Sequence, residues 1–156
     1  MNHYIATYNS PLGPIVIESD EQALTGLRFV GESEKVLIAK HNDAKIPILT
    51  EVIRWLDDYF AGRRPCNVPR LNPEETAFQR KVWKALLAIG YGQTKTYREI
   101  AEMVGCKSAQ AVGQAIGRNP IALIIPCHRV VGANGKIGGY AYGTEKKKKL
   151  LEKEQQ

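Results

Sequence analysis

Three side chains that could carry out chemistry, those of Cys127, His128 and Arg129, follow the apolar residues 121–125 after one proline, Pro126. A cysteine attacks carbon as its thiolate, and nearby cations favour that form of the thiol. We expect residues 121–125 to form a buried extended strand that leads into the cysteine. This arrangement makes Cys127 the predicted nucleophile.

His128 is the predicted partner of this thiol. Because adjacent residues of an extended chain point to opposite sides, we expect the imidazole not to contact the Cys127 sulfur and a water molecule to bridge the two. A carboxylate would then fix the imidazole tautomer, and Glu152 and Glu154 near the end of the last helix are both candidates. The alternative is a histidine with a purely structural role.

The other cysteines and histidines predict neither disulfides nor a metal site. Cys66 and Cys106 lack the neighbours of Cys127, and no two cysteines have CxxC spacing. We therefore expect both thiols to be reduced, buried and inert. In the N-terminal part, His3 and His41 have no cysteine beside them, so no zinc site is predicted.

The 156 residues, 44% of them hydrophobic, are enough to bury a core. No apolar run reaches the roughly eighteen residues of a membrane span, and the opening MNHYIATYNS lacks the basic and apolar segments of a secretory signal. We expect a protein with no membrane contact that is cytoplasmic, or nuclear in a eukaryote.

Charge is distributed unevenly along the chain. Residues 1–60 carry five Lys and Arg against nine Asp and Glu, whereas residues 61–156 carry seventeen against seven. The basic half is the candidate for a polyanionic partner, since Lys and Arg neutralise phosphates and release counterions. A basic surface that serves only solubility is the alternative.

The N-terminal part is predicted to be a small sheet covered by a helix. Short β-type runs over residues 4–8, 15–17 and 24–30 are separated by turn residues, which favours an antiparallel sheet. Apolar residues then recur at helical spacing and predict a helix that packs on the sheet. They are Leu49, Val52, Ile53, Leu56 and Phe60.

A change in composition marks the predicted domain boundary. Residues 62–73 hold three prolines and three arginines without periodicity, which is typical of a linker. We therefore expect an N-terminal structural lobe over residues 1–61 and a C-terminal lobe over residues 74–156. Asn72 as N-cap and Pro73 in the first turn would open the first helix of the C-terminal lobe, which Gly90 and Gly92 would end.

Two further helices are predicted in the basic half. Thr96 and Glu99 have capping-box spacing and open a helix that runs to Gly105, and Ser108 can cap a second helix that runs to Gly117. Two short helices around a glycine-containing turn indicate a helix-turn-helix, although ordinary helical hairpins share the pattern.

The second of these helices has a stripe almost bare of side chains. Ala109, Gly113 and Gly117 recur every four residues, which permits either close approach to another surface or tight packing between helices. Further on, residues 146–149 are four consecutive lysines in a helix opened by Thr144. We interpret the lysines as a solvated helix face in preference to a phosphate-binding one.

The pentapeptide Pro126-Cys127-His128-Arg129-Val130, with Asn119-Pro120 upstream, resembles the O6-alkylguanine-DNA alkyltransferases, whose active-site signature is Pro-Cys-His-Arg followed by Val or Ile. The resemblance covers residues 74–154 and, more weakly, Ser10-Pro11-Leu12-Gly13. It implies an α/β (α+β) fold, with a small N-terminal antiparallel sheet plus helix and a mainly helical C-terminal lobe that holds a helix-turn-helix of winged-helix type.

The resemblance also implies roles for individual residues. Catalytic matches are Cys127 as alkyl acceptor, His128 as its water-mediated base, Glu154 as the carboxylate that orients this base, Asn119 in the active-site turn, and Tyr97 as proton donor to the leaving base. Matches to the pocket wall are Val130, Tyr140, Ala141 and Tyr142. Matches to the DNA-binding surface are Gln79, Arg98, Lys107, Ser108, Gln110, Gly113 and Arg118.

The implied activity is that of a methylated-DNA-[protein]-cysteine S-methyltransferase that acts once. The partner would be double-stranded DNA containing O6-alkylguanine, with O4-alkylthymine as a further substrate, and the protein would act as a monomer without cofactor or metal. The damaged base would be rotated out of the duplex. Three alternatives remain: an alkyltransferase-like protein that binds the lesion without transfer, a helix-turn-helix regulator, and a thiol hydrolase or redox enzyme.

Two positions depart from the family pattern. Gln110 stands where the family commonly has the arginine that fills the space of the extruded base, so we expect weaker duplex binding or help from neighbouring cations. Tyr142 stands where some members have glycine, so we expect a pocket that is narrower for large alkyl groups.

Overall fold

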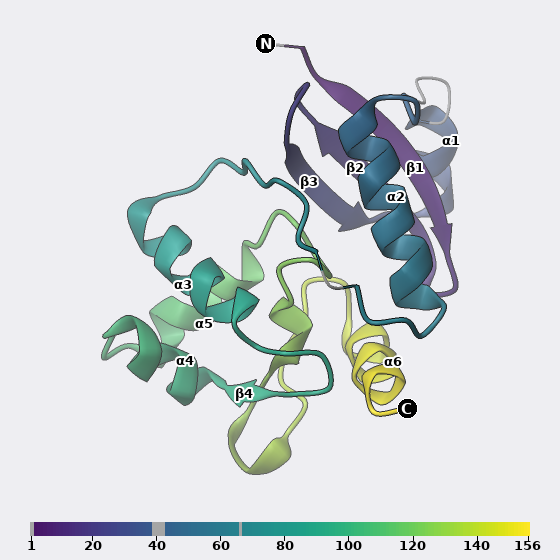
Figure 1. The fold of residues 1–156 in the computed structure, drawn as a ribbon. Coiled ribbons are helices and arrows are strands. Elements are labelled where there is room, and N and C mark those ends of the chain that lie inside the picture. Colours follow the sequence, from purple (N-terminus) through teal and green to yellow (C-terminus); the bar gives the residue numbers. More distant parts are fainter. Residues whose placement is uncertain (1, 39–42, 66) are drawn as a thin grey trace. The chain divides into compact units, whose positions relative to one another are not determined.

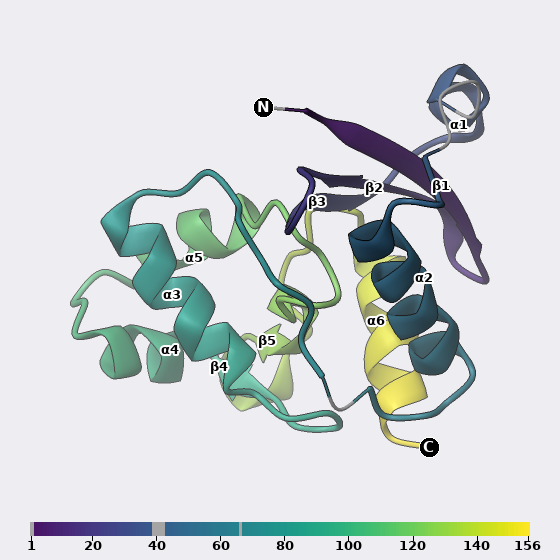
Figure 2. The same ribbon diagram turned by 45° about the horizontal axis from the view of Figure 1, so that its top comes forward.

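The computed structural model describes residues 2–38, 43–65 and 67–156, so the predictions for Cys66 and His41 lie outside the described residues. The chain divides into two compact units, residues 1–74 and 75–156. Among the helices described, none is both long and apolar enough to cross a membrane. Figures 1 and 2 show the elements of each unit from two directions.

The N-terminal unit is built on the antiparallel sheet that the sequence predicts. Its strands are β1 (Tyr4–Ser10), β2 (Gly13–Ser19) and β3 (Leu24–Phe29), in the order β1-β2-β3. Ile15, Val16 and Ile17 of the central strand are all fully buried. Both faces of the sheet are therefore covered.

Helices cover the two faces of this sheet, as Figure 2 shows. The predicted helix is α2 (Pro47–Phe60), which buries Leu49, Val52 and Leu56 against the sheet. The other helix, α1 (Glu32–Ile38), was not predicted: it buries none of its residues and so carries no amphipathic signal of a core helix.

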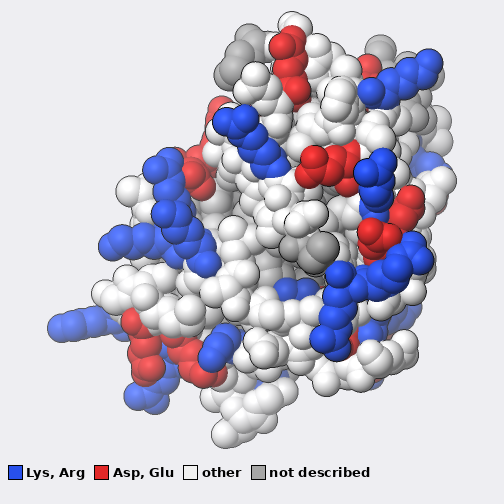
Figure 3. Space-filling view, in the orientation of Figure 1, with Lys and Arg blue, Asp and Glu red and all other residues white. Residues whose placement is uncertain are grey.

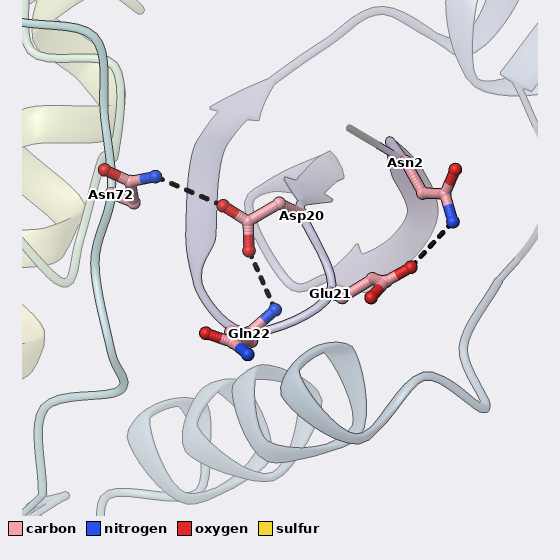
Figure 4. A pocket seen from close by; sticks show the side chains of 5 residues that line it. All are labelled: Asn2, Asp20, Glu21, Gln22 and Asn72. Atoms are coloured by element: carbon pink, nitrogen blue, oxygen red, sulfur yellow. Dashed lines mark hydrogen bonds between the residues drawn. The ribbon is translucent and has the colours of Figure 1, made fainter.

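Residues 70–72, within the predicted linker, are hydrogen-bonded to the start of β3. Leu24 N–H donates to the carbonyl of Arg70 at 2.8 Å, and Asn72 N–H donates to the carbonyl of Leu24 at 2.8 Å. The Asn72 side chain donates to Asp20 Oδ2 at 3.2 Å, as drawn in Figure 4. Asn72 therefore belongs to the N-terminal unit, and the prediction that it caps a helix is wrong.

An open, polar cavity lies beside the β2–β3 turn of the N-terminal unit (Figure 4). Its lining side chains bond mainly to one another: Asp20 accepts from the backbone N–H of Gln22 at 2.7 Å, and Asn2 donates to Glu21 at 2.6 Å. Among the described residues that line it, none is a histidine or a cysteine.

The C-terminal unit opens with three helices that pack on one another: α3 (Ala77–Leu87), α4 (Tyr97–Val104) and α5 (Ala109–Gly117). The N-cap of α3 is Thr76, four residues after the predicted cap Asn72, because Thr76 and Gln79 form a complete capping box. The side chains buried where the three helices meet are mainly aliphatic. They are Val82, Leu86, Ile100, Val112 and Ile116.

The predicted helix-turn-helix boundaries are confirmed. Thr96 and Glu99 form the capping box of α4, and Gly105 ends the helix in the left-handed region with φ 69°. Ser108 Oγ accepts the backbone N–H of Ala111 at 3.1 Å and caps α5. The buried residues of α5 are Val112, Ala115 and Ile116, as the periodicity predicts.

Residues 121–125 are buried, but they form turns and not the predicted strand. Leu123 has a positive φ of 67°, and the Asn119 side chain holds the turns: its Nδ2 donates to the carbonyl of Ile125 at 2.8 Å, and its Oδ1 accepts from Ile121 N–H at 3.0 Å. The amide of Asn119 thus supplies the hydrogen bonds that a neighbouring strand would have given.

After these turns come the short 3-10 helix η2 (Cys127–Arg129), the strand β5 (Val130–Val131), the 3-10 turn η3 (Ala133–Gly135) and α6 (Thr144–Glu154). Strand β5 pairs in parallel with β4 (Lys95–Thr96), directly before α4.

The lysine run in α6 is not wholly solvated as predicted, because Lys147 is fully buried. Its ammonium group donates to the backbone carbonyls of Val130 and Gly139.

Candidate active site

A cavity of about 350 Å³ in the C-terminal unit brings most of the predicted site residues together. It lies between the start of α4, the second half of α5, the turn before η2 and the loop before α6. Its lining residues are Tyr97, Gly113, Ile116, Gly117, Asn119, Cys127, Gly139, Tyr140, Ala141 and Tyr142. The bare stripe of α5 thus forms a wall of this cavity at Gly113 and Gly117.

Cys127 is the nucleophile candidate in this cavity, and it is 6% exposed. It begins the 3-10 helix η2, so the argument from alternating side chains of an extended strand does not apply here. Burial raises the pKa of the thiol, while a hydrogen bond with the Asn119 side chain and the charge of Lys147 act in the opposite direction. The net direction differs from the predicted lowering, because burial disfavours the charged form more than these neighbours favour it.

His128 and Glu154 form a fully buried pair. His128 Nε2 lies 2.6 Å from Glu154 Oε2, and both side chains are essentially inaccessible. Burial lowers the pKa of His128, so the imidazole is neutral. Because the carboxylate accepts at Nε2, that nitrogen carries the proton and Nδ1 carries the lone pair, and Nδ1 is buried with no partner among the described residues. Glu152 is exposed, which leaves Glu154 as the carboxylate.

Arg129 holds the same carboxylate from the other side. Its Nε donates to Glu154 Oε1 at 2.7 Å and its Nη2 to Oε2 at 3.2 Å, while Nη1 donates to the carbonyl of Ile89 at 2.7 Å. This bidentate pair fixes the carboxylate in the plane of the guanidinium. The sequence reasoning treated Arg129 only as a nearby cation that favours the Cys127 thiolate and did not predict that it binds Glu154.

Lys147 is a second residue that the sequence reasoning missed. Its Nζ donates to the carbonyl of Val130 at 2.5 Å and to that of Gly139 at 2.9 Å, and it lies 5.8 Å from the centre of the Tyr97 ring. Burial lowers its pKa to about 8. Nothing in a run of four lysines distinguishes the buried one, since only the folded chain provides the two carbonyls.

Tyr97 shares an acceptor with Lys147. Its hydroxyl donates to the carbonyl of Gly139 at 3.4 Å, and burial raises the pKa of the phenol, so it stays protonated. A weakly held hydroxyl at the edge of a cavity can donate to a ligand instead. Tyr97 therefore presents a protonated hydroxyl to the cavity that Cys127 also lines.

The predicted pocket wall is present with one exception. The rings of Tyr140 and Tyr142 meet edge to face, with centroids 5.4 Å apart, and Ala141 lies between them in the sequence. Val130 is fully buried and does not line the cavity, but its carbonyl accepts from Lys147. It contacts the site through its backbone.

Most of the predicted DNA-binding residues are exposed around the two helices of the helix-turn-helix. Arg98 in α4, Lys107 in the turn, and Gln110 and Arg118 at the two ends of α5 are all accessible. Ser108 is also exposed, with its hydroxyl in the cap of α5, whereas Gly113 is half-buried beside Tyr97. Gln79 uses its side-chain oxygen in the capping box of α3.

Basic side chains gather on the C-terminal unit, as the charge distribution suggests. In Figure 3, Lys and Arg side chains project from the surface over α3, and over α4 they alternate with acidic ones. Helix α3 contributes the exposed Arg80, Lys81 and Lys84.

Cys106, expected to be buried, is partly exposed in the turn between α4 and α5, with its Sγ 3.5 Å from the carbonyl of Ser108.

Two family models match this chain. Residues 77–156 match the DNA binding domain of 6-O-methylguanine DNA methyltransferase, and residues 3–68 match the ribonuclease-like domain of the same protein. A methylated-DNA--protein-cysteine methyltransferase of Methanosarcina acetivorans is 45% identical over 97% of both chains. Its counterpart from Mycobacterium tuberculosis is 42% identical over 99% of this chain and 93% of the relative.

Solved structures give the same result. The crystal structure of Mycobacterium tuberculosis OGT in complex with DNA superposes with a TM-score of 0.86 at 41% identity, over 97% of this chain and 92% of that one. An O6-methylguanine DNA methyltransferase of Methanococcus jannaschii superposes with a TM-score of 0.70 at 31% identity, over 96% and 92% of the two chains.

Fold, site and relatives together define a DNA repair methyltransferase with a DNA-binding domain. The chain belongs to the 6-O-methylguanine DNA methyltransferase family. This confirms the family, the α+β fold and the enzyme class that the pentapeptide implied.

Proposed function

We propose that this protein removes the alkyl group from O6-alkylguanine in double-stranded DNA by transferring it to Sγ of its own Cys127, once per molecule and without a cofactor. The observation that carries the proposal is the placement of Cys127 in a cavity, next in the chain to a neutral histidine that Glu154 orients. Membership of the family indicates that the lesion is O6-alkylguanine. The position of Cys127 in the cavity indicates that its Sγ is the acceptor atom.

The first step is deprotonation of the thiol. His128 Nδ1 has its lone pair free and accepts the Cys127 proton through one water molecule, while Glu154 stabilises the imidazolium that forms. The resting thiol is neutral, because burial raises its pKa. Deprotonation and attack therefore occur together once the alkyl carbon is in place.

The second step is alkyl transfer. The sulfur lone pair forms the S–C bond, the C–O6 bond breaks, and its electron pair stays on the guanine, which takes a proton from the Tyr97 hydroxyl. The Tyr97 hydroxyl is restored by a proton from water, and the His128 imidazolium returns its proton to water, so one proton leaves sulfur and one reaches guanine. The product is a thioether with no proton to lose and no good leaving group. The protein is consumed by one reaction.

Access to the lesion requires that the base leave the duplex. The O6 atom of a paired guanine lies inside the stack, and rotation of the base into a pocket costs a few kcal/mol, reduced by the weakened pairing of the damaged base. Helix α5 fits a role in the minor groove, since the turn before it exposes Lys107, its first turn exposes Gln110, and its glycine stripe lines the cavity.

The domain division of residues 1–61, 62–73 and 74–156 remains part of this proposal, with DNA contacts confined to the last segment. We propose that the protein acts as a monomer, because the proposed acceptor Cys127, its base His128 and the proton donor Tyr97 all belong to one C-terminal unit. Gln110 and Tyr142 set the two properties in which this chain should differ from relatives, namely duplex affinity and tolerance of large alkyl groups.

The test is to incubate the protein with duplex containing O6-methylguanine, digest it, and measure the Cys127 peptide by mass spectrometry. We expect one added methyl group, one equivalent per protein, and none in Cys127→Ser. Tight lesion binding without an adduct would identify an alkyltransferase-like recognition protein instead, and more than one turnover would identify a hydrolase.

A further inference from the structure

The turn between α3 and β4 holds Gly92 against the end of α6 (Figures 1 and 2). Gly92 N–H donates to Glu154 Oε1 at 3.4 Å, and its carbonyl accepts from Gln155 Nε2 at 2.8 Å. With φ 79°, Gly92 is in the left-handed region, and a Cβ there would lie 3.0 Å from the backbone oxygen of Glu154. The backbone of the turn therefore approaches the backbone at the end of α6 as closely as a residue without a side chain allows.

The same stretch of chain supports both ends of the site. Ile89, just before the turn, accepts from Arg129, which in turn holds Glu154. Just after the turn, β4 pairs with β5 and leads directly into Tyr97. Residues 89–97 thus connect the Glu154 carboxylate, which orients His128, to Tyr97, which lines the cavity together with Cys127.

We infer that Gln155 is a positioning residue for alkyl transfer: its amide fastens the end of α6 to Gly92, and so holds the Glu154 carboxylate in register with His128 and with the segment that carries Tyr97. This inference rests on the proposed function. Gln155 is exposed and contacts neither the thiol nor the cavity, so it acts only through Glu154.

The variants are Gln155→Ala, which removes the amide, and Gln155→Glu, which keeps its shape but cannot donate to the Gly92 carbonyl. Gln156→Ala is the matched control, since Gln156 is the exposed neighbour and bonds only through its backbone N–H to Lys153. Because Gln155 is on the surface, both variants should fold as the control does.

Two measurements are made on each. Single-turnover transfer from saturating methylated duplex should be about 2- to 10-fold slower in both Gln155 variants than in the control, the effect of one hydrogen bond. Independently of activity, the ¹⁵N–¹H signal of His128 Nε2 should be sharp and protected from exchange in the control, because His128 is fully buried. It should broaden in both variants.

Equal rates and an equally sharp His128 signal in the variants and the control would overturn the inference. A loss of thermal stability alone, with both readouts unchanged, would overturn it as well, because Gln155 would then be merely structural. Absence of any methyl adduct on the wild-type protein would refute the proposed function. The His128 signal would still report whether the hydrogen bond between Gln155 and Gly92 positions Glu154.

Discussion

Replacing Gly138 by alanine should slow alkyl transfer, because the new methyl group would press on Tyr97 and Lys147 together. A Cβ at this position would lie 3.1 Å from Tyr97 Cε2, 3.2 Å from the Tyr97 hydroxyl oxygen and 3.3 Å from Lys147 Nζ. Favourable contacts between such atoms are about 3.5 to 4.0 Å, so the phenol and the ammonium must each move by several tenths of an ångström.

The size of the effect follows from the hydrogen bonds that the Tyr97 hydroxyl and the Lys147 ammonium make. Both donate to the carbonyl of Gly139, the next residue, so a shift weakens the placement of the proton donor and of the cavity wall together. A misplacement of about 1 Å can cost on the order of 100-fold in rate, and we expect about tenfold for this smaller shift. Alanine with φ near 72° also costs about 1 to 2 kcal/mol of stability.

Gly135→Ala is the matched control, since Gly135 has φ 77° and no atom within 4 Å of an added Cβ. It carries the same backbone strain without the contact. The assay is single-turnover transfer at saturating methylated duplex, quenched at intervals and scored as methylated Cys127 peptide, at a temperature where both variants are folded. Equal slowing in the two variants would refute the reasoning, because the contact with Tyr97 and Lys147 would then have no consequence.

Three further predictions concern other parts of the site. Asn119→Ala removes the side chain that bonds to Ile121 and Ile125, so the free energy of unfolding in urea should fall by about 1 to 3 kcal/mol, and a loss below about 0.5 kcal/mol would contradict this. Burial lowers the pKa of His128 from 6.5, so below that value the unfolded chain binds a proton that the folded chain does not. The free energy of unfolding should therefore fall with acidification from about pH 7 to 5, and a fall of the same size in His128→Gln would rule His128 out as the cause. Gln110→Arg should bind alkylated duplex more tightly at moderate salt, with a steeper salt dependence by about one counterion, and unchanged binding isotherms would show that this position makes no contact with DNA.

Local signals in the sequence were sufficient where the residues that make a structure are neighbours in the chain. The capping box at Thr96 and Glu99, the cap at Ser108 and the glycine after α4 all act within a few residues, and the structure contains each of them. The three strands of the N-terminal sheet were equally readable, because β-type runs alternate with turn residues.

Local signals failed where a distant partner decides. Asn72 resembles a helix cap, but it is hydrogen-bonded to Leu24 and Asp20 instead. The cap of α3 is Thr76. Residues 121–125 are apolar enough for a buried strand, and periodicity cannot distinguish a strand from a buried turn that Asn119 satisfies. Lys147 is buried although its position in a lysine run predicts exposure, since the two carbonyls that accept from it come from residues outside α6.

The site itself shows the same division. Cys127, Asn119, Tyr97 and the two tyrosines of the wall lie in one cavity, and the pentapeptide was sufficient to find them. Their catalytic roles remain predictions for the experiments above. The direction of the thiol pKa was wrong because it depends on burial, which a list of neighbouring residues does not report.

The cluster of Arg129, Glu154 and His128 has one consequence for the proton inventory of the reaction. The guanidinium already neutralises the carboxylate, so a proton that moves from sulfur to imidazole leaves the total charge of the interior unchanged. Over the single reaction, one proton leaves the Cys127 sulfur and one proton is gained by guanine, so no net proton is released or taken up. The extent of repair at completion should thus be insensitive to the acidity of the medium, even where its speed is not.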